Sequence, residues 1–192
     1  PTERQVLEQA SVIGSVFWLG ALVVMGRVSR EPPGLWGGSG DLEPHLRDIL
    51  EGLVERDYLM PMPDSTFIDD QEFAFKHNLE REMIRRMVSP ASAKSYHALL
   101  AQWLEYRVPD QSEEFLDMLA VNYEKGGDPL TAGRYYMMAA SAARERFANR
   151  KSAEYFTKGL DLIGTLDSAR RLNGLHDLGD VLQRSGALDR AL

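Results

Sequence analysis

The chain contains no cysteine, so disulfides, cysteine-based zinc sites and cysteine nucleophiles are excluded. Histidine is scarce as well, because only four occur and they lie far apart without a short-range ligand pair. We therefore expect no metal site. Without disulfides, a cytoplasmic location is the default expectation.

Basic residues are the minority among the charged side chains. Lysine and arginine total 22 against 29 aspartates and glutamates, which gives a net charge of −7. Proteins that grip phosphate backbones need a basic face, so the composition disfavours nucleic-acid binding. With 192 residues, 44% of them hydrophobic, the chain is long enough for one domain or two small ones.

A long hydrophobic run is also missing. Residues 10–26 carry no charge, but a membrane span needs about 20 apolar residues. Gly14, Ser15 and Gly20 interrupt the stretch. We expect two buried helices that meet at Gly14-Ser15, and no membrane contact.

Catalytic motifs are absent from the sequence. It has no glycine-rich phosphate loop, no Gly-x-Gly-x-x-Gly and no Gly-x-Ser-x-Gly. The Asp69-Asp70 pair lies in a polar stretch, where a solvated turn is the expected structure. Glu113 and Glu114 are expected at a helix N-terminus, where negative charge suits the helix dipole. We predict no catalytic residues and no enzymatic activity for this segment.

Arg81, Arg85 and Arg86 form a small basic face around Glu80 and Glu82. We expect solvated arginines that pair with these glutamates. An anion-binding site is the alternative.

The N-terminal part predicts helices separated by a loop. Thr2 is placed to cap a helix whose apolar residues recur at helical spacing until Gly14 ends the run. A second short helix is predicted over residues 17–25. Residues 29–40 contain two prolines and four glycines and predict a loop, with Trp36 docked on the body.

A third helix can be capped by Asp41. Its inward face is predicted to comprise Leu42, Leu46, Ile49, Leu50, Leu53 and Val54. Residues 58–62 and 72–76 are predicted to be two strands joined by a turn. Three helices followed by a two-stranded hairpin is the order of a winged helix, so we predict a winged-helix domain over residues 1–88.

The remainder of the chain is predicted to form helices only. One apolar stripe at helical spacing comprises Leu79, Met83, Ile84 and Met87. Residues 89–112 are predicted to contain a connecting helix that begins at Pro90, a favoured first position.

Residues 113–192 predict an array of helical repeats. Helices are expected near 113–125, 129–147, 149–163 and 168–185, joined by short turns. The spacing of bulky and small residues is that of tetratricopeptide (TPR) repeats at Leu119, Ala120, Tyr123, Gly127, Ala132, Tyr136 and Ala139, and again at Leu175, Leu178, Gly179, Leu182, Gly186 and Ala191. Residues 129–147 can close one repeat or open the next. We expect the array to be truncated at its C-terminal end, in a segment of a longer protein.

His77 is the candidate site residue. It follows Lys76 at the point where the second predicted strand passes into a helix. One interpretation is a local role, in which the ring caps the helix or packs nearby. The other is contact with a phosphate group or an acidic partner.

Five segments of the sequence resemble one protein family. They are VLEQASVIGSVFWLGAL, LEGLVERDYL, FAFKHNLEREMIRRMV, YHALLAQWLE and VNYEKGGDPLTAGRYYMMAASAARERFANRKSAEYFTKGLDL. In this order they resemble the region after the nucleotide-binding domain in bacterial signal-transduction ATPases of the STAND class. The likeness covers nearly the whole chain and is most specific over residues 73–87 and 122–160. Residues 29–40 depart from the family and look like an insertion.

The resemblance implies a mainly α chain, with a winged helix that carries a small β-hairpin followed by TPR-like helical hairpins. In this class the winged helix packs on the nucleotide-binding domain and helps to hold the ADP-bound resting state. ATP or ADP is therefore expected in the parent protein, and no cofactor in this segment. By resemblance, His77 takes the role of a histidine that approaches the bound phosphates. Many members also carry an adenylate or guanylate cyclase, kinase or DNA-binding domain.

We therefore expect a non-catalytic regulatory and protein-interaction segment. Its expected partners are the upstream nucleotide-binding domain of the same chain and a protein or ligand on the repeats, and a homo-oligomer is also compatible. The alternative is a DNA-binding winged-helix transcription regulator with an effector-binding repeat domain. Residues 41–57 argue against it, because they carry six acidic and two basic side chains. No motif supports a third hypothesis, a stand-alone enzyme.

Overall fold

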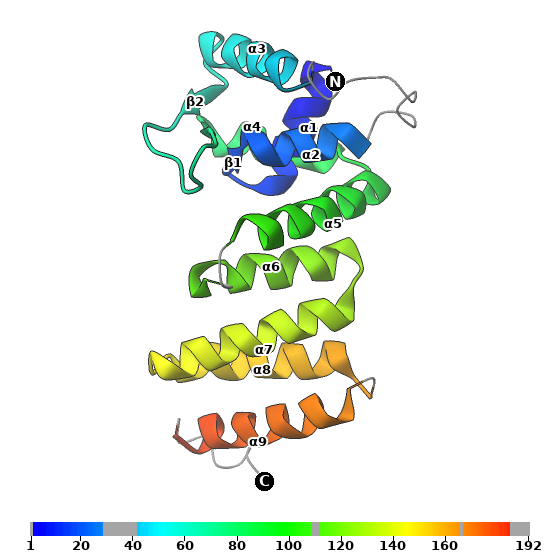
Figure 1. Cartoon of the computed structure of the whole chain (residues 1–192), viewed down its shortest axis with the longest axis vertical. Helices are drawn as coiled ribbons and strands as arrows, with labels where there is room; N and C mark the ends of the chain where they lie inside the picture. Colours follow the sequence, from blue (N-terminus) through cyan, green and yellow to red (C-terminus); the bar gives the residue numbers. More distant parts are fainter. Residues whose placement is uncertain (1, 29–41, 109–111, 166, 185–192) are drawn as a thin grey trace. The chain divides into compact units, whose positions relative to one another are not determined.

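The computed structural model describes residues 2–28, 42–108, 112–165 and 167–184 (Figure 1). The chain divides into two compact units, Pro1–Arg107 and Val108–Leu192. In the described residues helices predominate and three short strands form one antiparallel sheet, which confirms a mainly α fold with a small β element. The predicted loop at 29–40, Trp36, the Asp41 cap and the expected truncated end lie outside the described residues.

Helix α1 covers Glu3–Ile13 and agrees with the prediction. The Thr2 hydroxyl accepts the backbone N–H of Gln5 at 3.3 Å, which satisfies one of the free donors at the helix start. Gly14 is the C-cap. Val6 and Ala10 are buried in the core of this unit.

The predicted helix over residues 17–25 is wrong at its start. Val16–Trp18 form strand β1, and helix α2 covers Leu19–Val28. β1 pairs antiparallel with β3, with Phe17 opposite Phe73. The partner strand lies more than 50 residues away, so helical spacing in the N-terminal sequence carries no sign of this pairing. The sheet therefore has three strands in the order β1–β3–β2 and not two.

The rest of the sheet and its covering helix follow the prediction. Helix α3 covers Leu42–Glu55, β2 covers Leu59–Pro61 and β3 covers Glu72–Phe75. The α3 side chains in the core are Leu42, Leu46, Leu50 and Leu53, with Ile49 and Val54 packed against it. The rings of Phe17 and Phe73 stack at 5.9 Å between centroids in the same core.

Two further helices complete the N-terminal unit. Helix α4 covers Asn78–Met87 and helix α5 covers Pro90–Arg107. α4 packs mainly on α1, whereas α5 packs on α1 and α2. The helix expected to connect two domains thus contributes to the core of the first unit, with Tyr96, Leu100 and Leu104 buried.

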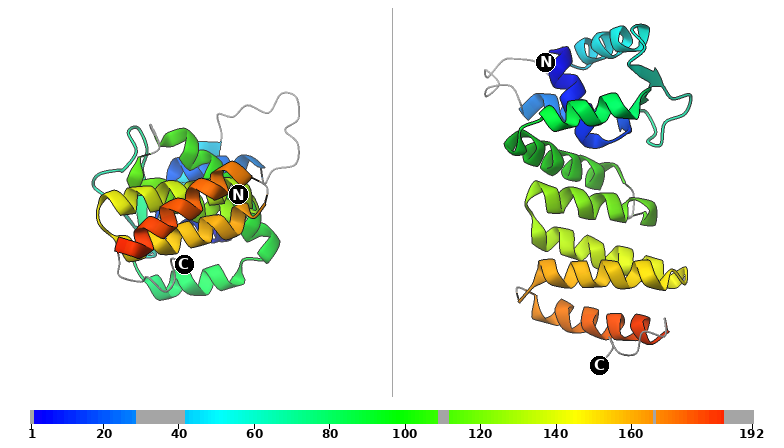
Figure 2. Two further views of the ribbon diagram at one scale, coloured as in Figure 1. Left: turned by 90° about the horizontal axis from the view of Figure 1, so that it is seen from below. Right: turned by 180° about the vertical axis from the view of Figure 1, so that it is seen from behind.

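The C-terminal unit contains four successive antiparallel helices in its described part (Figure 2). They are α6 (Glu113–Gly126), α7 (Pro129–Glu145), α8 (Asn149–Ile163) and α9 (Ser168–Arg184). Each packs on the next, and all four predicted helices are confirmed to within two residues. Glu113 and Glu114 lie in the first turn of α6, as expected.

Helices α7 and α8 approach each other closely at two glycines. A β-carbon on Gly133 would lie 3.0 Å from the Gly159 carbonyl oxygen and 2.6 Å from Cγ1 of Ile163. Glycine is therefore required for this backbone approach.

A partly buried polar network joins α6, α7 and α8. The Tyr136 hydroxyl donates to Glu124 at 2.7 Å, and Nζ of Lys158 lies 2.7 Å from the same carboxylate oxygen. Burial, reinforced by Glu124, raises the pKa of Tyr136 to about 12. The hydroxyl therefore stays protonated and keeps donating throughout the neutral range.

Candidate interaction surface of the N-terminal unit

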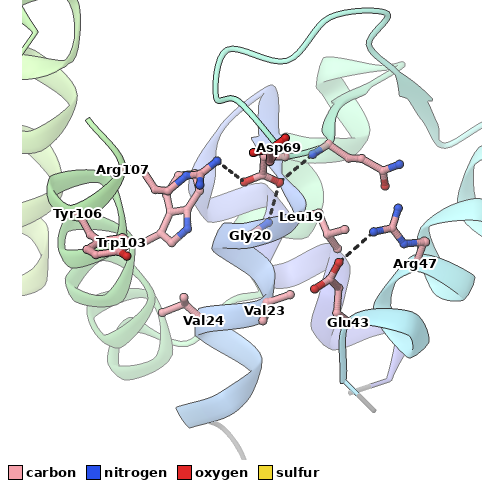
Figure 3. A pocket seen from close by; sticks show the side chains of 12 residues that line it. Leu19, Gly20, Val23, Val24, Glu43, Arg47, Asp69, Trp103, Tyr106 and Arg107 are labelled. Carbon is pink, nitrogen blue, oxygen red and sulfur yellow. Dashed lines mark hydrogen bonds and ion pairs between the residues drawn. The ribbon is translucent and has the colours of Figure 1, made fainter. Parts of the chain in front are cut away.

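A pocket of about 280 Å³ lies between α2, α3, α5 and the β2–β3 loop (Figure 3). Its apolar wall comprises Leu19, Val23, Val24, Trp103 and Tyr106. Its polar residues come from α3, from the loop and from the last residue of α5.

Asp70 fastens the loop to the start of α2. Its side chain is only 7% exposed, and Oδ1 accepts the backbone N–H groups of Gly20 at 3.0 Å and Gln71 at 2.8 Å. The prediction of a solvated Asp69-Asp70 turn is wrong for Asp70, because the first N–H groups of α2 need an acceptor. Asp69 is exposed.

Gly20 makes this contact sterically feasible. A β-carbon at this position would lie 2.5 Å from Oδ2 of Asp70 and 3.2 Å from Nε1 of Trp103. The glycine that interrupts the uncharged run in the sequence thus admits a carboxylate and an indole to the helix start.

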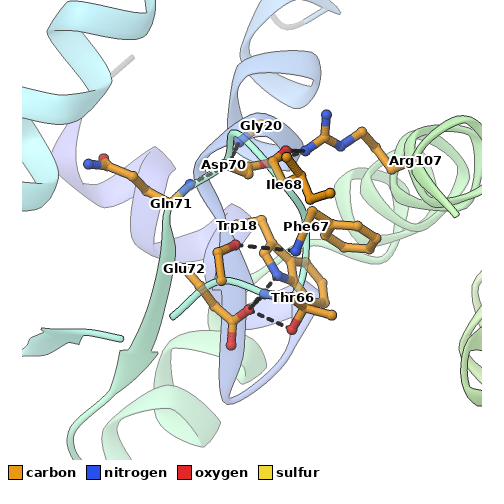
Figure 4. A network of polar contacts seen from close by, with 10 residues as sticks. Trp18, Gly20, Thr66, Phe67, Ile68, Asp70, Gln71, Glu72 and Arg107 are labelled. Atoms are coloured by element: carbon orange, nitrogen blue, oxygen red, sulfur yellow. Dashed lines mark hydrogen bonds and ion pairs between the residues drawn. The ribbon is translucent and has the colours of Figure 1, made fainter. Parts of the chain in front are cut away.

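Glu72, the first residue of β3, fastens Thr66 of the loop (Figure 4). Its buried Oε2 accepts Nε1–H of Trp18 at 2.9 Å, the Thr66 backbone N–H at 2.8 Å and the Thr66 hydroxyl at 2.7 Å. Burial alone would raise the pKa of Glu72, but these hydrogen bonds outweigh burial and lower it below its usual value. The carboxylate is therefore ionised at neutral pH.

Phe67 fixes the middle of the loop. Its ring lies edge-on to Trp18 and Trp103, with 5.1 Å between centroids in each pair. The Arg107 guanidinium lies 5.6 Å from the Phe67 ring centre and donates to the Ile68 carbonyl at 2.6 Å. The polar composition of the loop does not reveal this aromatic anchor.

The charged groups around the pocket are mostly paired. Glu43 accepts a hydrogen bond from Arg47 at 2.9 Å, and Asp70 lies 3.8 Å from Arg107. In the described residues no group of three or more histidines, aspartates and glutamates could hold a metal ion. The Asp70–Arg107 pair links the loop to α5, whereas the Glu43–Arg47 pair lies within α3.

His77 lies at the N-cap of α4 with an extended backbone (φ −124°). The side chain is exposed and makes no capping hydrogen bond, whereas the main-chain carbonyl accepts the N–H of Arg81 at 3.3 Å. The capping form of the local interpretation is therefore not observed. Neighbouring Lys76 forms an ion pair with Asp57.

Helix α4 presents its apolar side chains to solvent. Leu79 is 73% exposed, Met83 60% and Met87 61%, and their spacing of four residues places them on one side of the helix. We call these three residues the α4 ridge. Of the predicted stripe, Ile84 alone packs against the core, and no residue of α4 is fully buried. An exposed apolar stripe of this kind is typical of a contact surface.

The inward side of α4 carries an arginine instead. Arg85 approaches the Val12 carbonyl at 3.4 Å and Nε2 of His97 at 3.2 Å. Burial lowers the pKa of Arg85. The prediction of three solvated arginines is therefore wrong for Arg85, although Arg81 does pair with Glu82.

The sequence did contain a signal for this arrangement. Arg81 and Arg85 lie on the side of α4 opposite the ridge, next to Ile84, so the helix could bury either its arginines or its ridge. Periodicity identifies the two sides but not the one that faces the core.

Comparison of the chain with protein-family models, with curated proteins and with solved structures finds no match. Among the helices in the described residues, none has the length and apolar character needed to cross a membrane.

Proposed function

We propose that the chain is a non-catalytic regulatory and protein-interaction segment of a signal-transduction ATPase of the STAND class. In this proposal the N-terminal unit is a winged helix that packs on the nucleotide-binding domain of the parent protein. The C-terminal unit is a TPR-like array that binds a partner or a signal.

The α4 ridge is the observation that carries the proposal. Three large apolar side chains at helical spacing remain exposed while the neighbouring arginine is directed inward. A helix with this polarity buries its apolar face only against another protein surface. His77 begins the same helix, so a domain docked on the ridge would meet the exposed imidazole.

The element order supports the winged-helix part of the proposal. Three helices precede the β2–β3 hairpin, and β1 adds a third strand on the other side of β3. The four stacked helices of the second unit support the repeat part, since the tight α7–α8 contact has the small residues that paired helices require.

In this proposal only one residue of the chain, His77, would contact a nucleotide. His77 is exposed and makes no side-chain cap, so its imidazole is available to a phosphate, whereas Lys76 is engaged by Asp57. The chain would add a single donor to a nucleotide held by the upstream domain. ATP or ADP therefore belongs to the parent protein in this proposal.

A groove in the second unit suits a partner on the repeats. It has a volume of about 280 Å³ and lies between α7 and α9, with Phe156 of α8 in its lining. Met137 and Met138 supply apolar lining, and Arg134 and Asn173 supply polar groups. Methionine side chains adapt to varied apolar partners.

The DNA-binding alternative has less support. The exposed positions of α3 include Glu43, Asp48, Glu51 and Glu55, and the nearest arginine, Arg47, is paired with Glu43. A DNA-recognition helix with this negative charge is repelled by the phosphate backbone.

The α4 ridge can be tested in the full-length ATPase. We expect Met83→Asp to weaken ADP retention and to raise basal ATP turnover, because the charge opposes docking of the nucleotide-binding domain. The isolated chain should keep its melting temperature, since Met83 is exposed. Ile68→Asp is the matched control: this side chain is also exposed in the same unit but lies outside α4. Unchanged ADP retention in Met83→Asp would refute the proposed contact.

A further inference from the structure

Phe147 follows Arg146, the C-cap of helix α7, and has a left-handed backbone conformation with φ of 59°. Its N–H donates to the Arg144 carbonyl at 3.0 Å, and the Ala148 N–H donates to the Ala143 carbonyl at 2.9 Å. This pair of hydrogen bonds defines the helix C-terminal motif in which glycine is the usual residue. Glycine does occupy the positive-φ position after α6 (Gly127, 91°) and after α8 (Gly164, 55°).

At this position the Phe147 side chain buries little of its surface against the rest of the chain. It is 85% exposed, so the ring is not held there by the core. A large exposed ring is the kind of side chain that anchors protein interfaces.

A hollow of about 300 Å³ lies beside Phe147. It is lined by Ala139, Ala142, Ala143, Ala148 and Tyr155. Two of its lining residues, Arg146 and Ala148, flank Phe147 in the sequence. Since an apolar cavity of about 150 Å³ accepts benzene, this hollow has room for a phenyl ring.

Charges of both signs border the hollow. Glu113, Glu114 and Asp117 come from α6, whereas Arg146 and Lys151 come from the end of α7 and from α8. Glu113 already pairs with Arg146 in the same chain, and Nζ of Lys151 lies 5.2 Å from the centre of the Tyr155 ring. Glu114 is therefore the lining charge best placed to meet a cation of a second copy. A two-fold axis would set the acidic residues of one copy against the basic residues of another.

We propose that the chain self-associates through this face, with Phe147 of one copy seated in the alanine-lined hollow of a second copy. One surface supplies a projecting ring, a hollow that fits a ring and opposite charges, which is the self-complementarity of a two-fold interface. This inference is independent of the ATPase assignment.

Sedimentation of the whole chain tests the proposal. We expect a dimer at concentrations up to about 100 µM, where a micromolar Kd is saturated. Phe147→Ala, which removes the ring, and Ala142→Leu, which fills the hollow, should each weaken dimerisation at least about tenfold. Phe147→Tyr should retain the dimer. Leu172→Ala is the matched control, because Leu172 is 69% exposed in the same unit but lies on α9, and it should leave the dimer intact.

Folding of the variants is checked by thermal melting. Phe147→Gly should dissociate the dimer as Phe147→Ala does, yet it should melt at a higher temperature, because glycine accepts the positive φ. If both Phe147 variants unfold, the Ala142→Leu variant decides. A monomeric wild-type chain at these concentrations, a Phe147→Ala dimer as tight as the wild type, or equal weakening by Leu172→Ala would each overturn the proposal.

Discussion

Gln9 is fully buried on α1, and neither its side-chain oxygen nor its nitrogen has a hydrogen-bond partner. A buried polar group without a partner costs about 1–3 kcal/mol. Gln9→Met keeps the length of the side chain and removes both polar atoms. We expect it to raise the free energy of unfolding by about 1–2 kcal/mol, measured by urea denaturation. Gln5→Met, at a half-buried position of the same helix, is the control and should change little.

Glu72 makes the stability of the N-terminal unit depend on pH. Burial opposes its ionisation, but the hydrogen bonds from Thr66 and Trp18 outweigh burial and lower its pKa. A depressed carboxyl pKa contributes stability that is present above the ordinary value and is lost as the pH falls through the folded-state value.

We therefore expect Glu72→Gln to be less stable than the wild type at pH 7, because it loses charge-assisted hydrogen bonds. The difference should shrink on acidification from about pH 5 to pH 3, as the wild-type carboxylate is protonated. Urea midpoints across this range measure the effect. A difference that stays constant with pH would contradict the assigned role of the ionised carboxylate.

Substitution of His77 can distinguish a local structural role from the proposed nucleotide contact. Because the imidazole is exposed and makes no cap, His77→Ala should change the stability of this chain by less than about 1 kcal/mol. In the proposed parent ATPase the ADP affinity should fall about ten- to a hundredfold, since a charge-assisted hydrogen bond contributes roughly 1.5–3 kcal/mol. A large melting shift with unaltered ADP binding would favour the local role.

At the scale of elements, α4 shows that a periodic apolar stripe does not by itself identify a core. Its ridge and its arginines are equally regular in sequence, and the helix directs Arg85 toward Val12 and His97. The guanidinium finds acceptors on α1 and α5 there, which meets the need of a half-buried cation. The ridge is consequently available for an external contact.

We expect substitution by alanine to have opposite effects on stability at two glycines of the C-terminal unit. Gly133→Ala should destabilise the chain by about 1–3 kcal/mol, because the new methyl group would collide with Ile163 and the Gly159 carbonyl. Gly179→Ala should stabilise it by up to about 1 kcal/mol, because nothing lies within 4 Å of the new β-carbon and alanine favours helix. Thermal melting of both variants measures the contrast. Equal effects would contradict the close α7–α8 approach.

At the scale of the whole molecule, the net charge of −7 governs the encounter with polyanions. We expect no complex with duplex DNA in a gel shift at about 150 mM salt. Glu51→Lys combined with Glu55→Lys, on the exposed side of α3, should introduce weak and salt-sensitive binding as a positive control. A submicromolar, sequence-selective complex of the wild type would favour the transcription-regulator alternative.

Much of the helical content is predictable because helix starts and stops are local. Thr2 and Gly14 lie at the two ends of α1 that they were expected to mark. Caps and turns act within about four residues, so the information is contiguous in the sequence.

The sequence by itself determined the mainly α character, the positions of most helices, the apolar face of α3 and the absence of cysteine chemistry. The tertiary structure alone decided the pairing of β1 with β3, the Asp70 cap of α2, the Phe67 anchor and the exposure of the α4 ridge. The physical reason is that the local sequence pattern determines which side of a helix or strand is apolar and which is polar. Contacts between residues about 50 positions apart, such as Gly20 with Asp70, determine which side is covered.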